Sequence, residues 1–135
     1  MPRFTRLLIA VALVAFGCGT SLLGGGCGIG VASSECAPGQ VCECNEIGTC
    51  TQTCTGHGCD FACTGEGTCT LNCPQGGCTA SCSNAGSCTL NCPGNDCALA
   101  CHGTGQCRMA ECKTDCNLAC GNIGTCEQVD GGDAG

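Results

Sequence analysis

The chain has few of the side chains from which a conventional hydrophobic core is built. Among its 135 residues there is no Trp, no Tyr and only three Phe, namely Phe4, Phe16 and Phe61. Large aromatic and aliphatic side chains supply most of the apolar burial in a globular domain. The first two Phe lie in a predicted leader, so the mature protein would keep only Phe61. This shortage excludes an ordinary core and requires another means of holding the chain together.

Basic residues are also scarce. Four Lys and Arg stand against eleven Asp and Glu, for a formal net charge of −7. Removal of Arg3 and Arg6 with the leader would leave Arg108 and Lys113 against the same eleven carboxylates, a net charge of −9. Nucleic acids and anionic membrane surfaces attract proteins of the opposite charge. The composition therefore predicts no nucleic-acid partner, and membrane contact only through a lipid anchor.

Cysteine and glycine, in contrast, are abundant. The chain contains 22 Cys and 24 Gly. A cysteine content above roughly 8–10% marks a disulfide scaffold. Disulfides form and persist in oxidising compartments, which include the cell exterior and the bacterial periplasm. The composition therefore predicts an exported protein in which disulfides replace much of the missing hydrophobic burial.

The N-terminus has the layout of a secretory signal peptide, which we expect to comprise residues 1–17. Arg3 and Arg6 precede an unbroken apolar run over residues 7–16. A basic start followed by a short apolar region and small residues is typical of a cleaved leader. The run is too short to span a membrane as a helix.

Cys18 follows this leader and is a candidate lipidation site. The stretch 14–18 resembles a bacterial lipobox, in which the cysteine is lipidated and becomes the mature N-terminus. Ordinary cleavage fits the same residues, and Cys27 is an alternative lipid site. If Cys18 is not lipidated, it could instead pair with Cys27. The Gly- and Ser-rich residues 18–34 would form a flexible tether.

Eighteen cysteines between Cys44 and Cys126 follow a period of nineteen residues. Within each period the cysteines are six, four, five and four residues apart. A short and regular period indicates one structural unit stacked several times. One glycine also recurs at a constant place in each period: Gly48, Gly67, Gly86, Gly105 and Gly124.

The segments of the form Cys-x-x-x-Cys have the periodicity of β-strands. In an extended strand both cysteines and the middle residue face one side, and their neighbours face the other. Gly- and Pro-rich links bound each segment, which argues against helices. Seven of the eight middle residues are apolar, and the eight are Gln52, Phe61, Leu71, Ala80, Leu90, Leu99, Met109 and Leu118.

Two strands and two turns per period predict an all-β fold. We expect a short two-sided β-solenoid of about four 19-residue coils over residues 35–126, stapled by disulfides. An irregular disulfide-rich small domain is the alternative. Residues 127–135 are expected to be a disordered tail. One cysteine departs from the period: Cys112 stands one residue late, and a bulge in its strand would absorb the shift.

Two disulfide schemes fit the period. In the first, bridges join strands within a coil, for example Cys69 to Cys82, and both terminal cysteines of the array stay unpaired. In the second, a bridge spans every turn and all eighteen cysteines are used. We favour the second, although sequence alone does not fix connectivity. It pairs Cys44 with Cys50, Cys54 with Cys59, Cys63 with Cys69, Cys73 with Cys78, Cys82 with Cys88, Cys92 with Cys97, Cys101 with Cys107, Cys112 with Cys116 and Cys120 with Cys126, and upstream Cys36 with Cys42 as a cap.

The outward threonines are the clearest functional signal. Thr51, Thr70 and Thr89 would stack in one column, which Arg108 interrupts one coil later. Flat hydroxyl arrays on disulfide-laddered solenoids resemble those of insect antifreeze proteins, which present Thr-x-Thr to ice. This resemblance implies an ice-binding face. Threonine is also favoured on any exposed strand, so a purely structural role explains the same residues.

Thiolate metal binding is a further alternative, and enzymatic activity is not expected. Metal sites favour tightly grouped cysteines such as Cys-x-x-Cys, whereas only Cys42 and Cys44 are closer than four residues apart. The two histidines, His57 and His102, lie in Gly-rich turns without an adjacent nucleophile or orienting group. We therefore expect no catalytic residue, no cofactor, no bound metal and no small-molecule substrate.

Taken together, the leader and the whole repeat resemble cysteine-rich repeat lipoproteins of secreting bacteria. The resemblance implies a location rather than an activity. We therefore expect an exported, non-enzymatic structural or binding module, anchored to the cell envelope by a lipid on Cys18, with an unknown partner. Secretion without an anchor is the alternative if Cys18 is not lipidated.

Overall fold

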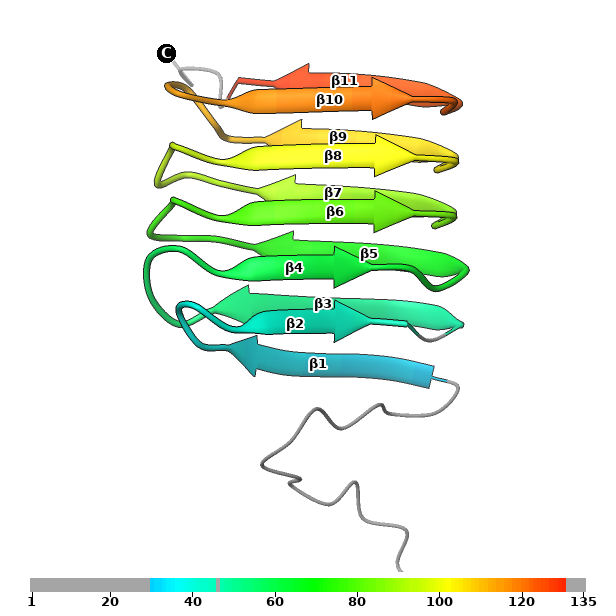
Figure 1. Cartoon of the computed structure of the whole chain (residues 1–135), viewed down its shortest axis with the longest axis horizontal. Helices are drawn as coiled ribbons and strands as arrows, with labels where there is room; N and C mark the ends of the chain where they lie inside the picture. Colours follow the sequence, from blue (N-terminus) through cyan, green and yellow to red (C-terminus); the bar gives the residue numbers. More distant parts are fainter. Residues whose placement is uncertain (1–29, 46, 131–135) are drawn as a thin grey trace, which may run out of the picture.

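The structure, a computed structural model, describes residues 30–45 and 47–130 (Figure 1). The predicted signal peptide, the lipidation of Cys18 and the larger part of the tether lie outside these residues. The same holds for Cys27 and for residues 131–135 of the predicted tail.

The described chain is an all-β solenoid built of two parallel sheets that face each other. Figure 1 shows the even-numbered strands in one layer and the odd-numbered strands behind them. The six-stranded sheet contains β1 (Gly30–Cys36), β3 (Gly48–Cys54), β5 (Gly67–Asn72), β7 (Ser87–Asn91), β9 (Gln106–Ala110) and β11 (Thr125–Val129). The five-stranded sheet contains β2 (Val41–Cys44), β4 (Asp60–Cys63), β6 (Thr79–Ser83), β8 (Ala98–His102) and β10 (Asn117–Gly121).

These eleven strands, two to a coil, make about five coils, one more than the period predicted. The predicted fold class is confirmed, and no described residue lies in a helix. Equivalent residues of successive periods pair in register: Cys50 lies beside Cys69, and Cys69 beside Cys88. Parallel strands stacked in this way are about 4.8 Å apart.

The interior is filled by the middle residues and the cysteines. Leu71, Leu90 and Met109 from the six-stranded sheet and Phe61 and Leu99 from the facing sheet are at most 2% exposed. The strand alternation therefore points these side chains inward, as the sequence predicted. Such a narrow core holds little apolar area, so the disulfides carry an unusual share of the stability.

Every described cysteine belongs to a disulfide that spans one turn. The structure has the second of the two schemes derived from the sequence, together with the Cys36–Cys42 cap. The bridged cysteines are four to six residues apart. Each bridge therefore closes a turn between the two sheets, and none joins two neighbouring strands of the same sheet.

The solenoid extends beyond both expected boundaries. β1 begins at Gly30, inside the predicted tether, and β11 ends at Val129, inside the predicted tail. β1 was missed because its register departs from the period: Cys36 pairs with Cys54, eighteen residues later, and Ser34 occupies the usual apolar middle position. At the other end, β11 continues past Cys126 because β9 offers it a paired strand through Ala110.

The predicted bulge in the strand before Cys112 is also wrong. β9 stays in register with β7 through Ala110, which pairs with Asn91. The extra residue, Glu111, follows the strand and has a φ of 64°, in the left-handed region. Because the insertion lies at the corner, β9 pairs with β7 and β11 without a break in register, whereas a bulge would interrupt the ladder.

Candidate functional site

The outer face of the six-stranded sheet carries columns of polar side chains. Thr51 points outward because its neighbours in β3, Cys50 and Gln52, are both buried. The register places Thr51 beside Thr70, and Thr70 beside Thr89. The three threonines form a straight column of half-buried side chains along the solenoid.

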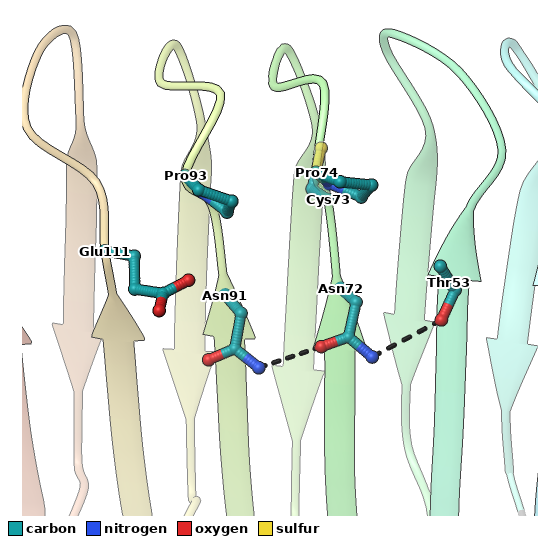
Figure 2. A pocket seen from close by; sticks show the side chains of 7 residues that line it. All are labelled: Thr53, Asn72, Cys73, Pro74, Asn91, Pro93 and Glu111. Carbon is teal, nitrogen blue, oxygen red and sulfur yellow. Dashed lines mark hydrogen bonds between the residues drawn. The ribbon is translucent and has the colours of Figure 1, made fainter. Parts of the chain in front are cut away.

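Hydrogen bonds connect the coils in a second column. Asn91 Nδ2 donates to Asn72 Oδ1 at 2.8 Å, and Asn72 Nδ2 donates to Thr53 Oγ1 at 3.3 Å (Figure 2). In-register parallel stacking brings like amides close enough to form such a ladder. The ladder therefore links one side chain from each of β3, β5 and β7.

A third column, made of Thr49, Thr68 and Ser87, was not anticipated from the sequence. These residues pair in register and precede the first cysteine of each strand. The signal was the same two-residue alternation, continued by one step toward the N-terminus of each strand. We call the nine positions of the three columns the polar grid: Thr49, Thr51, Thr53, Thr68, Thr70, Asn72, Ser87, Thr89 and Asn91.

The polar grid covers three coils and ends abruptly at β9. On β1 the first column continues with Ser33, and the second column meets Glu35. On β9 the first column meets Arg108 and the second meets Ala110. All three columns are therefore uncharged hydroxyl and amide side chains only on β3, β5 and β7.

A groove runs along the second column, near the corners where the chain leaves the six-stranded sheet for the five-stranded sheet. It has a volume of about 430 Å³. Pro74 and Pro93 lie on one side, and the amide ladder lies on the other (Figure 2). We call this the ladder groove, and its lining residues are Thr53, Asn72, Cys73, Pro74, Asn91, Pro93 and Glu111.

A second hollow of about 330 Å³ lies on the same face, nearer the N-terminal end. Its lining is formed by Ser33, Ser34 and Glu35 of β1 with Thr51 and Thr53 of β3. Ser33 and Glu35 are exposed, so this hollow offers hydroxyl groups and one carboxylate at the surface.

Three groups of three cysteines are close enough to suggest a metal site. Within each group, the sulfur atoms all lie within 4.8 Å of one another. One group is Cys82, Cys88 and Cys101. Cys82 and Cys88 form one disulfide, however, and Cys101 belongs to another. Metals bind cysteine as the thiolate. The proximity therefore comes from disulfides stacked on neighbouring coils, and thiolate binding would require their reduction.

Neither histidine belongs to a catalytic arrangement of side chains within the described residues. Both are exposed. The ring of His57 covers Gly77, and the ring of His102 covers Gly121, so each lies against a glycine of a neighbouring coil. Neither ring makes a side-chain hydrogen bond to a described residue that could orient it as a base.

In residues 30–45 and 47–130 there is no helix long and apolar enough to cross a membrane. The fold and the polar grid together define a disulfide-stapled parallel β-solenoid whose six-stranded sheet carries in-register polar columns on its outer face. No protein-family model, curated protein or solved structure matches the chain.

Proposed function

We propose that the protein is an exported, non-enzymatic structural or binding module, anchored at the cell surface by a lipid on Cys18. The observation that carries this proposal is that all the described cysteines are oxidised in ten turn-spanning disulfides. Such a scaffold is suited to an oxidising compartment. The leader and the lipobox-like residues before Cys18 support the anchor.

The intact mass of the protein recovered from an exporting bacterial host tests this proposal. The expected mass is that of residues 18–135 with an added lipid and with the described cysteines oxidised. Cys18→Ser should abolish the lipid mass and move the protein to the soluble fraction, whereas Cys27→Ser should leave the lipid in place. An intact leader, or mostly free thiols in the native protein, would contradict the proposal.

Ice binding is the second candidate function. It is favoured by the in-register column of Thr51, Thr70 and Thr89 on the outer face of the six-stranded sheet and by the neighbouring hydroxyl column. Thermal hysteresis of the folded protein is the direct measurement. We expect Thr70→Leu to reduce the hysteresis and Thr79→Leu, on the other sheet, to leave it unchanged. Absence of hysteresis in the unaltered protein would eliminate this candidate.

A further inference from the structure

The amide ladder has a direction, and it ends on an unused acceptor. Each amide donates its hydrogen bond toward the N-terminal coil: Asn91 to Asn72, and Asn72 to Thr53. Asn91 Oδ1 is therefore the acceptor that a further member of the ladder would occupy. No described residue donates a hydrogen bond to it. Because Asn91 is half-buried, this oxygen is accessible from the ladder groove.

The next coil supplies a second acceptor where a donor would be expected. The residue paired with Asn91 is Ala110, whose methyl group cannot donate. The residue after it, Glu111, has a φ of 64° and lines the same groove. Figure 2 shows the Glu111 side chain on the β9 side of Asn91, the side toward which the Asn91 oxygen points. The end of the ladder groove thus presents an amide oxygen and a carboxylate.

These two groups favour a ligand that only donates hydrogen bonds and carries positive charge. A primary ammonium has three donors and no acceptor. A calcium ion is a poorer fit, because it takes six to eight oxygen ligands. Arg108 is not among the residues lining the groove, although it lies on the same strand as Ala110. The negative net charge of the chain also attracts cations.

The rest of the groove suits an aliphatic chain attached to that ammonium. Pro74 and Pro93 provide apolar ring surfaces along one side. Long amines lay their methylene groups on apolar surface while the charged end reaches a polar partner. The groove volume of about 430 Å³ is ample for such a chain.

We propose that the ladder groove binds a primary ammonium on an aliphatic chain, held by Asn91 Oδ1 and the Glu111 carboxylate. The source is either a lysine side chain of a partner protein or a free polyamine. This inference rests on the proposed binding role and gives that role a ligand chemistry. It requires neither export nor the lipid anchor, so its failure would be distinguishable from theirs.

The test is an NMR titration of the disulfide-intact protein with 1,5-diaminopentane, following the side-chain amide signals of Asn72 and Asn91. We expect saturable shifts that weaken as salt is added, since ions screen the attraction. Glu111→Gln should weaken binding about tenfold through loss of the charge-assisted hydrogen bond. The matched control, Glu66→Gln, replaces an exposed carboxylate in a turn outside the groove and should leave binding unchanged.

Three results would overturn the proposal: no saturable shift, equal weakening by the two Glu→Gln changes, or equal shifts with the uncharged 1,5-pentanediol. Backbone amide spectra of each variant establish that the solenoid stays folded. A parallel titration with Nα-acetyl-lysine amide distinguishes the sources. Tighter binding of the lysine derivative supports a protein partner, and tighter binding of the diamine supports a polyamine.

Discussion

At the residue scale, the recurring glycine of the longer turns is required by close contact between coils. A Cβ on Gly105 would lie 2.6 Å from the carbonyl oxygen of Gly86, and one on Gly86 would lie 3.1 Å from that of Gly67. In-register stacking places each turn directly against the equivalent turn before it. The period therefore preserves glycine here because a side chain would strike main-chain atoms that cannot rotate away.

Gly105→Ala is expected to lower the free energy of unfolding by about 1–3 kcal/mol, the usual cost of overpacking. Gly86→Ala is the matched control and should cost less, because its added Cβ meets the neighbouring oxygen at a longer distance. Denaturant unfolding of the disulfide-intact proteins measures both changes. Equal costs for the two substitutions would contradict the close-contact explanation.

Gln52 is a residue whose burial carries a cost. It is 3% exposed, and its Nε2 donates to the Glu43 carbonyl oxygen at 3.0 Å, while Oε1 has no hydrogen-bond partner. Leu71 and Leu90 occupy the equivalent position in the next two coils. The amide reaches the carbonyl of an edge strand, since β2 is the last strand of its sheet in the described chain.

Gln52→Leu is therefore expected to raise the free energy of unfolding by about 1 kcal/mol, because a buried unsatisfied polar atom costs about that much or more. The Glu43 carbonyl that loses its donor belongs to an exposed residue and can be hydrated. Thermal unfolding under oxidising conditions would measure the change. A clear destabilisation would show that the amide's single hydrogen bond outweighs its unpaired oxygen.

At the element scale, the amide ladder joins three strands that no disulfide links. Asn72→Ala removes both of its hydrogen bonds and should lower the free energy of unfolding by about 1–2 kcal/mol. Asn117→Ala is a suitable control, because Asn117 is exposed at the start of β10 and makes no side-chain hydrogen bond within the described chain. If both variants lose the same stability, the ladder contributes nothing.

Most strands were predictable because the cysteines mark them. The alternation of cysteine, outward residue and middle residue determined which side chains face inward. The exceptions have local causes: β1 lies outside the nineteen-residue register, and the insertion at Glu111 was displaced from the strand to the corner. The cysteine spacing showed that this period contains one extra residue before Cys112. Only the register of β9 with β7 shows that the extra residue is Glu111, at the corner.

The candidate site was predicted less completely than the fold. The column of Thr51, Thr70 and Thr89 followed from the period alone. The direction of the amide ladder did not, because it depends on side-chain rotation rather than on spacing. The ladder groove also depends on how Pro74 and Pro93 lie at the corners, which no periodicity describes.

At the scale of the whole molecule, the solenoid is least protected at its C-terminal end. Cys120 and Cys126 are both exposed, whereas the bridges from Cys44–Cys50 to Cys101–Cys107 are buried. The last coil also has no coil beyond it within the described residues. A disulfide that closes a small loop lowers the entropy of the unfolded chain, which stabilises the folded state by about 2 kcal/mol. Loss of one bridge should therefore loosen one coil before the rest.

Partial reduction should open Cys120–Cys126 first. Exchange requires a reductant to reach a sulfur, so exposure controls the order. Brief treatment with a phosphine reductant, alkylation at low pH and mass mapping of the labelled cysteines measure this order. Initial labelling of a buried pair, such as Cys82–Cys88, would indicate that the coils open cooperatively instead of from the end.

The disulfide connectivity of the native protein, determined by mass spectrometry of its unreduced fragments, tests the stapled solenoid most directly. We predict ten turn-spanning bridges, from Cys36–Cys42 to Cys120–Cys126, each joining cysteines four to six residues apart. Bridges that skip a turn, such as Cys69–Cys82, or a majority of free thiols would contradict the stapled solenoid on which every proposed function rests.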